Sequence, residues 1–305
     1  MRVGISITSG YRGTTAAEAV NTVIERARVA AAAGLDHLSL GDHHVAGPDG
    51  LYVQNVPMVG RLMADWPADR PIGCLFLLPL WHPVLVAEQI GTLAAMSDVP
   101  FIVQTGIGWG DAEFAAFGRR PRERGAVTDE AIRVIKGLLA GETVSSERLN
   151  IVDAAIGPCP PHGVEWWIGA GTGDRPLGRA AAQGDAWYIG PAMPPDQLPT
   201  QIERYRSMCA AAGTAPRVIV RRDVFITDDD AEGLRRGREM VAAGYRGMTE
   251  DVLIYGGVDR AVDRLSALAE SGVDDVVVRT MSVGPAEALR SIELTGEARR
   301  RLLGG

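Results

Sequence analysis

The amino-acid sequence predicts an α/β fold, a (β/α)8 TIM barrel with insertions, spanning residues 1–305 as a single domain. The first observation is alternation, because eight apolar runs of strand length are each followed by a helical region. The second is that runs such as Val276–Val278 are continuously apolar, as in parallel strands buried on both faces. Eight such units favour a closed barrel, and an open doubly wound sheet is the alternative.

The first half of the chain supplies four strand–helix units. Strands are expected at Val3–Ile7, Leu38–Leu40, Pro71–Leu78 and Phe101–Ile107. Helices are expected after them at Ala16–Ala33, Val56–Ala64, Pro83–Met96 and Ala126–Leu139. The first helix follows a threonine cap with Glu18 placed for a capping box, and Gly34 ends it.

The second half supplies the remaining units. Strands are expected at Trp166–Ile168, Ala186–Ile189, Val218–Ile226 and Val273–Arg279. Helices are expected at Leu177–Gln183, Pro195–Ala212, Ala231–Ala243, Val258–Ser271 and Pro285–Leu303. Segments longer than an ordinary connection are often functional, and four are present: His43–Asn55, Gly108–Gly125, Gly141–Glu165 and Tyr245–Gly257.

Composition excludes several classes of function. The formal net charge of −7 argues against a nucleic-acid binder. Three cysteines without a CxxC spacing argue against a disulfide framework or a zinc site. The one lysine, Lys136, falls in an amphipathic helical run where we expect it to be solvated, which disfavours a Schiff-base aldolase.

The sequence also bears on location and partners. The chain has neither a signal-peptide pattern nor an apolar run of 18 residues, so we expect a cytoplasmic protein without a membrane partner. A small-molecule substrate is expected, and a homodimer is left open.

The motif GDHHV, Gly41–Val45, begins where the second predicted strand ends. In a barrel that position faces the active-site mouth, and an Asp before a His can orient an imidazole for proton transfer. The alternative is a loop whose polar residues cap backbone groups. A metal site is disfavoured, because His43 and His44 would point in different directions in an extended segment.

Two glycine-rich segments follow later strands. In Ile168–Asp174 the glycines and the following helix N-terminus suit a phosphate, and Arg175 adds positive charge nearby. In Thr105–Asp111 the glycines would let a flat ring approach, and Trp109 could stack on it or pack against the rim. For His82 we favour a role at a helix start before Pro83 over a catalytic one.

Four motifs in order resemble the luciferase-like monooxygenase family, in particular its actinobacterial F420-dependent branch. They are GLDHLSLGDHHV, LLPLWHPVLVAEQIGTLAAMS, TGIGWGDAEFAAFG with RERG, and WWIGAGTGDRPLGRAAAQGDAWYI. The resemblance runs from Val3 to about Arg279 and implies a barrel that binds FMN or the deazaflavin F420 at its C-terminal mouth. It implies that His43 matches the family's active-site histidine and Asp42 the acidic residue before it.

The resemblance also implies the residues that hold the cofactor. A bulge that often contains a cis non-proline bond backs the ring, and the ring meets the fourth-strand exit and a phosphate-binding turn. The matching residues are Leu75 and Phe76 for the bulge, Ile107 and Gly108 for the ring, and Ala170, Gly171, Thr172 and Gly173 for the turn. We expect Trp109 and His44 in the substrate pocket. Trp109 replaces the glutamate of the family's sugar-phosphate dehydrogenases, which disfavours that reaction, and Leu75 is large for the bulge.

Three functional hypotheses follow. The first is hydride transfer between F420 and a small organic substrate, with His43 moving a proton and Arg175 helping to hold the phosphate. The second is an FMN-dependent monooxygenase that uses reduced flavin and oxygen. The third, a flavin-binding barrel without turnover, is disfavoured by the Asp42–His43 pair.

Overall fold

Eight parallel strands close into a barrel in a computed structural model that describes residues 1–304 except 109 and 158. In barrel order the strands are β1 (Arg2–Ile7), β3 (Leu38–Leu40), β5 (Ile72–Leu77), β6 (Phe101–Gly106), β9 (Val164–Gly169), β10 (Ala186–Ile189), β11 (Val218–Ile226) and β13 (Asp275–Thr280). Pairing of β10 with β11 and of β13 with β1 closes the ring. The barrel prediction is therefore confirmed, and the open sheet is excluded.

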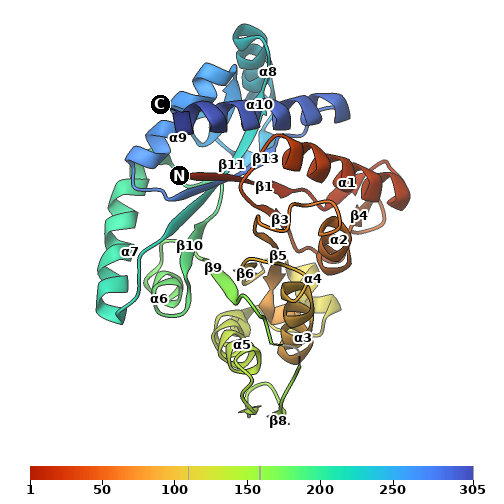
Figure 1. Ribbon diagram of the computed structural model, residues 1–305, viewed down its shortest axis with the longest axis vertical. Helices are drawn as coiled ribbons and strands as arrows, with labels where there is room; N and C mark the ends of the chain where they lie inside the picture. Colours follow the sequence, from red (N-terminus) through yellow and green to blue (C-terminus); the bar gives the residue numbers. More distant parts are fainter. Residues whose placement is uncertain (109, 158, 305) are drawn as a thin grey trace.

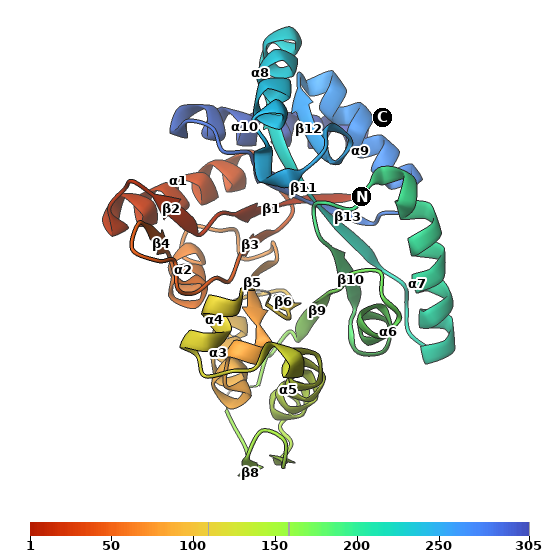
Figure 2. The same ribbon diagram turned by 180° about the vertical axis from the view of Figure 1, so that it is seen from behind.

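The helices surround the barrel on its outside (Figures 1 and 2). They are α1 (Ala16–Ala32), α2 (Asn55–Leu62), α3 (Pro83–Ala94), α4 (Asp111–Ala116), α5 (Arg124–Leu139), α6 (Asp174–Gln183), α7 (Leu198–Ala212), α8 (Asp230–Ala242), α9 (Val258–Glu270) and α10 (Pro285–Gly304). The predicted capping box starts α1, because Thr15 and Glu18 bond each other's backbone amides.

The connections between the barrel strands contain structure that the sequence pattern did not predict. Among the described residues, five short strands occur there: β2 (Gly10–Arg12) pairs with β4 (Gly50–Tyr52), β7 (Val144–Ser146) pairs with β8 (Ile151–Ala154), and β12 (Leu253–Gly256) extends the main sheet. Short 3₁₀ helices occur at η1 (Leu78–Leu80), η2 (Pro121–Glu123), η3 (Pro195–Gln197), η4 (Tyr245–Gly247) and η5 (Glu250–Val252). β12 pairs with the last residues of β11, beyond the point where β10 leaves it.

Apolar side chains fill the middle of the barrel. The interior cluster contains Ile102, Trp167, Ala186, Ile219 and Val277, with Tyr188 packed against it. Because side chains alternate along a strand, residues two positions further on point inward closer to the mouth. At the N-terminal end, ion pairs join Arg2 and Arg217 to Glu165 and Asp275. The barrel is thus closed at its base and lined with polar groups toward its mouth.

The lysine and the cysteines have the following environments in the structure. Lys136 is not solvated as expected: it is half-buried over the Trp166 ring and its Nζ donates to the Gln183 carbonyl at 2.5 Å. Cys74, Cys159 and Cys209 are all free. Among residues 1–304 without 109 and 158, no helix is long and apolar enough to span a membrane.

Candidate active site

The predicted motifs meet at one end of the barrel. Gly41 follows β3, Gly106 ends β6, and Ile168 lies near the end of β9, in strands that run parallel to one another. The carboxyl ends of parallel strands share one face of a barrel, so the predicted common location is confirmed.

Asp42 is a buried anchor for the edge of β5. β3 ends at Leu40, and its pairing with β5 stops at Cys74. Beyond that point the Leu77 amide donates to Asp42 Oδ2 at 2.8 Å, and the Asn55 side chain donates to the Leu75 carbonyl at 2.5 Å. The same Asp42 oxygen accepts the Trp81 indole N–H at 2.7 Å. Asp42 therefore replaces a missing strand partner and fixes Trp81.

The imidazole beside Asp42 belongs to His44. His44 Nε2 lies 3.1 Å from Asp42 Oδ1, and the His44 amide donates to Glu113 at 2.9 Å. The expectation that Asp42 orients His43 is corrected, because its carboxylate contacts the next residue instead. Burial lowers the pKa of His44, but the Asp42 and Glu113 carboxylates outweigh it, so this pKa is raised above its usual value.

His43 has a different environment from its neighbour. Its ring lies 5.2 Å from the Tyr52 ring of β4, measured between centroids. Burial lowers the pKa of His43, and the positive charges of Arg279 and Arg246 lower it further against the opposing effect of Glu113 and Asp42. The lowered pKa favours the neutral imidazole, which is the form that can accept a proton.

Leu75 and Phe76, the residues expected to form the bulge, lie where β5 has left its pairing with β3 but still pairs with β6. β5 pairs with β6 in continuous register from Gly73 through Leu77. Phe76 is fully buried in the outer core, where its ring meets that of Trp81 at 5.6 Å. Only the half-buried Leu75 faces the side of the strand that carries Gly73 and Leu77. The structure therefore brings Leu75, and not the Phe76 side chain, toward the barrel interior.

The exit of β6 is held by an arginine that the sequence analysis assigned no role. Gly108 has a φ of +66°, and its carbonyl accepts a hydrogen bond from Arg124 at 3.3 Å. Arg124 is the first residue of α5 and belongs to the RERG motif. Ile107 is half-buried beside this turn, whereas Trp109 lies outside the described residues.

The turn from β9 to α6 has the features of a phosphate cradle. Among the described residues, no side chain caps the α6 N-terminus at Gly173, and none has an atom that would lie within 4 Å of a Cβ added at Gly171. The Ala170 carbonyl is bound by the Trp187 indole at 2.9 Å, and the Thr172 carbonyl is bound by Arg204. Free amides at a helix N-terminus attract anions.

Arg175 does not sit over this turn. Its side chain is 75% exposed, and its guanidinium lies 3.5 Å from Asp129 of α5. Arg204, which also pairs with Asp174, is the arginine that contacts the turn itself. Arg175 was expected to help hold a phosphate, but its side chain is turned toward Asp129 rather than toward the turn.

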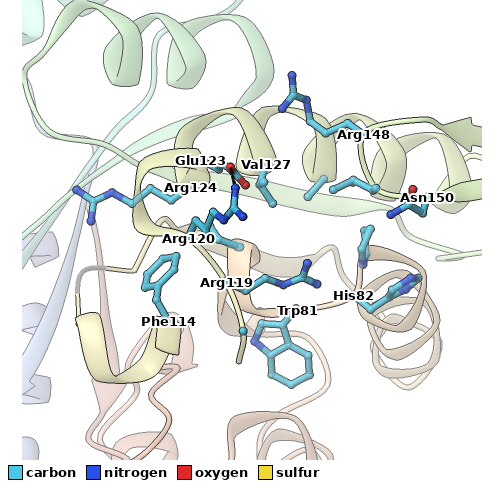
Figure 3. A pocket seen from close by; sticks show the side chains of 15 residues that line it. Trp81, His82, Phe114, Arg119, Arg120, Glu123, Arg124, Val127, Arg148 and Asn150 are labelled. Atoms are coloured by element: carbon cyan, nitrogen blue, oxygen red, sulfur yellow. Dashed lines mark ion pairs between the residues drawn. The ribbon is translucent and has the colours of Figure 1, made fainter. Parts of the chain in front are cut away.

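A pocket next to the candidate active site has Trp81 in its wall. The pocket measures about 200 Å³ and lies between η1, α4, α5 and the β7–β8 turn. Figure 3 shows the Arg119 guanidinium near Trp81 and His82, with Arg124 pointing away from His82. His82 is exposed and immediately precedes Pro83, the first residue of α3, as its predicted helix-start role requires.

The amino-acid sequence is similar to that of a known protein family. A family model described as luciferase-like monooxygenase matches residues 1–291. An uncharacterized protein of Mycobacterium tuberculosis is 31% identical over 177 residues, which are 55% of this chain and 59% of that protein. An FMNH(2)-dependent dimethylsulfone monooxygenase of Pseudomonas putida is 25% identical over 167 residues, 53% of this chain and 46% of that enzyme. The matches therefore span about half the length of these relatives.

Solved structures share the fold over almost the whole chain. A monooxygenase from Streptomyces bottropensis has a TM-score of 0.81 at 18% identity, covering 98% of both chains. An F420-dependent secondary alcohol dehydrogenase in complex with an F420-acetone adduct has a TM-score of 0.78 at 16% identity, covering 98% of this chain and 99% of that one. A Baeyer–Villiger monooxygenase from Pseudomonas putida in complex with FMN reaches 0.77 at 16% identity, covering 98% of both.

Proposed function

Because this chain belongs to the luciferase-like monooxygenase family, we propose that it is an F420-dependent oxidoreductase acting on a small organic substrate. The observation that carries the proposal is the position of His43 at the mouth, just after the β3 exit and 5.2 Å from the Tyr52 ring of β4. Burial, together with the charges of Arg279 and Arg246, lowers the pKa of this imidazole and so favours its base form. Removing hydride from an alcohol carbon also releases the hydroxyl proton, so the reaction needs a base of this kind.

The residues at the mouth fit a flavin-type cofactor. Gly171, Thr172 and Gly173 lead into the uncapped N-terminus of α6, and the open space at Gly171 leaves room for a phosphate, whereas the Ala170 amide donates to the Tyr188 carbonyl at 3.4 Å. The backbone at Gly106 and Gly108, together with Leu75, would face the ring. When bound, the deazaflavin supplies a carbon centre that accepts or donates a hydride.

The chain's own residues then have distinct roles. His43 accepts the substrate proton at an imidazole nitrogen, or returns it in the reverse direction. Asp42 keeps the β3 exit attached to β5 and holds Trp81, so it positions the histidine segment without touching His43. The β2–β4 pair brings Tyr52 over His43 and limits access of water to it.

An FMN-dependent monooxygenase is the second candidate. It is favoured by the partial match to the FMNH(2)-dependent dimethylsulfone monooxygenase and by a neighbour solved with FMN. The same phosphate turn would serve FMN, so the turn does not separate the two candidates.

Single-turnover measurements on His43→Ala and His44→Ala test the assigned base. With reduced or oxidised F420 bound, His43→Ala should lower the rate by about 10²–10⁴-fold and leave cofactor affinity nearly unchanged. His44→Ala should lose less, because its imidazole contacts Asp42, Trp81 and Phe117. A larger loss for His44→Ala would assign proton transfer to the Asp42–His44 pair.

A further inference from the structure

The inner faces of β11 and β13 carry an arginine-rich cluster near the mouth. Ile219 and Val277 belong to the interior cluster, and Arg221 and Arg279 lie two residues further along the same strands. Period-two alternation therefore turns both arginines inward. Asp223 is the register partner of Arg279 and shares this face.

One carboxylate serves several cations in this cluster. Asp223 is fully buried; it accepts a hydrogen bond from the Tyr245 hydroxyl at 2.9 Å and lies 3.3 Å from Arg221 Nε and 3.7 Å from Arg246 Nε. Arg279 donates to the Thr8 hydroxyl at 2.5 Å, which contributes no negative charge. Nε and Nη2 of Arg221 are buried without a hydrogen-bond partner among the described residues.

The base of the same barrel provides an internal comparison. There, Arg2 and Arg217 pair with Glu165 and Asp275, so two cations meet two anions. At the mouth, Arg221 and the 45% exposed Arg246 lie 3.3 and 3.7 Å from the Asp223 carboxylate, whose charge also acts on Arg279. The two inward-facing cations Arg221 and Arg279 therefore share one buried anion, which leaves an excess of one positive charge even before Arg246 is counted. Buried charges are costly unless they are paired, so a purely structural network would be balanced like the base.

The excess positive charge lowers the pKa of neighbouring groups. Burial lowers the pKa of Arg279 to about 10, and repulsion by Arg221 and Arg246 contributes to this shift. Arg279 and Arg246 also lower the pKa of His43. A ligand anion on these guanidiniums would therefore lie within electrostatic reach of the imidazole that we assign as the base.

We propose that the substrate carries an anionic head group, a carboxylate, sulfonate or phosphate ester, which Arg221 and Arg279 bind at the mouth beside His43. Planar guanidiniums bind such oxyanions through parallel hydrogen bonds, and Arg221 Nη2, which has no hydrogen-bond partner among the described residues, is available for this contact while Nε faces Asp223. Tyr245 and Arg246, from the segment before β12, contact Oδ2 of Asp223, whereas Arg221 lies near Oδ1. This inference rests on the proposed function, because it assigns a substrate to the same mouth.

The cofactor phosphate has a separate place. The turn Ala170–Gly173 follows β9, and β10 stands between β9 and β11 in the barrel. Arg204 and the amides at the α6 N-terminus belong to that turn, whereas Arg221 and Arg279 lie on β11 and β13, two and three strands further around the barrel. A substrate anion and a cofactor phosphate can therefore bind together.

Calorimetric titrations with aromatic probes test the assignment. Benzoate, benzenesulfonate and phenyl phosphate should bind the wild-type protein, and the affinities rank the three head groups. Benzamide and benzyl alcohol, which match benzoate in shape without its charge, should bind at least about 10-fold more weakly. Equal binding of benzoate and benzamide would overturn the proposal.

Variants locate the anion. Arg279→Gln and Arg221→Gln should each weaken the preferred anion by about 10- to 100-fold, whereas Arg235→Gln, at an exposed arginine of α8, should not. Arg279→Lys keeps the charge and should recover part of the affinity. Losses no larger than that of Arg235→Gln would refute the assignment.

Two further readouts separate this inference from the cofactor assignment. In protein carrying ¹³C-labelled histidine, benzoate should raise the pKa of His43 measured by NMR, because it offsets the charges of Arg279 and Arg246. Titration with F420 and with FMN should give the same affinities in Arg279→Gln as in wild type, within about twofold. If either cofactor loses affinity in Arg279→Gln and blocks benzoate, the arginines bind the cofactor and the inference fails. If neither cofactor binds but benzoate does, the proposed function fails instead.

Discussion

Replacing Asp42 should separate its structural role from its electrostatic one. In Asp42→Ala, the buried Leu77 amide and the half-buried Trp81 indole lose their shared acceptor. An orphaned buried donor costs about 1–3 kcal/mol, so the two together should lower the free energy of unfolding by about 2–6 kcal/mol. Urea denaturation followed by tryptophan fluorescence measures the loss.

Asp42→Asn is the matched comparison. Both donors bond the same Asp42 oxygen, so the amide oxygen of asparagine can accept both and its NH2 group then faces His44. Most of the stability should remain, within about 1 kcal/mol of wild type. The pKa of His44, measured by NMR, should nevertheless fall, because the charge that raises it is gone. Equal stability of Asp42→Ala and wild type would refute the anchoring role, and an unchanged His44 pKa in Asp42→Asn would refute the electrostatic one.

Three other outcomes follow from the buried charges. His37 is fully buried, and burial is the main cause that lowers its pKa to about 4. Its contribution to the free energy of unfolding should therefore be complete above about pH 6.5 and fall by about 3 kcal/mol as the pH drops toward 4. His37→Phe should flatten this part of the pH–stability curve, and an unchanged curve would contradict the assignment. Arg2→Met should lower the free energy of unfolding in urea by about 1–3 kcal/mol, because it breaks partly exposed ion pairs at the balanced base. Arg279→Met should lower it by less than about 1 kcal/mol, because it removes an excess cation. Equal losses in the two variants would show that the mouth arginines are structural. The rate of hydride transfer from an alcohol should rise with pH through a pKa below 6.5 as His43 loses its proton, and pH-rate profiles that keep this step in His43→Ala would assign it to another group.

The barrel could be predicted because each of its strands has a local sequence signal. Runs such as Val218–Ile226 and Val273–Arg279 are long and apolar, and turns or helices separate them. β12 was missed because Leu253–Gly256 is too short to stand out from the loop around it, and it is a strand only because the end of β11 is left without a partner. Its formation depends on tertiary structure.

The site was predicted less completely than the fold. The location of GDHHV at a strand exit follows from topology alone, but the pairing of Asp42 with His44 depends on where β3 ends and on the left-handed turn at Val45, whose φ is +54°. Arg221 and Arg279 lie two positions beyond the interior residues Ile219 and Val277, so alternation places them inside the barrel once the inner face of each strand is known. The sequence alone does not separate Arg221 from Arg222, which lies two positions beyond the outer-core residue Val220 and faces outward. Arg124 and Arg204 could not be assigned in advance, since both bind backbone carbonyls of distant turns.

The central claim is that the mouth binds a flavin-type cofactor and that this cofactor is F420. Calorimetric titration of the purified protein with F420 and with FMN tests it most directly, with Gly171→Val as the control because its side chain would occupy the open space in the phosphate turn. We expect F420 to bind more tightly than FMN and both to weaken in Gly171→Val. Binding of FMN without binding of F420 would contradict the claim and favour the monooxygenase.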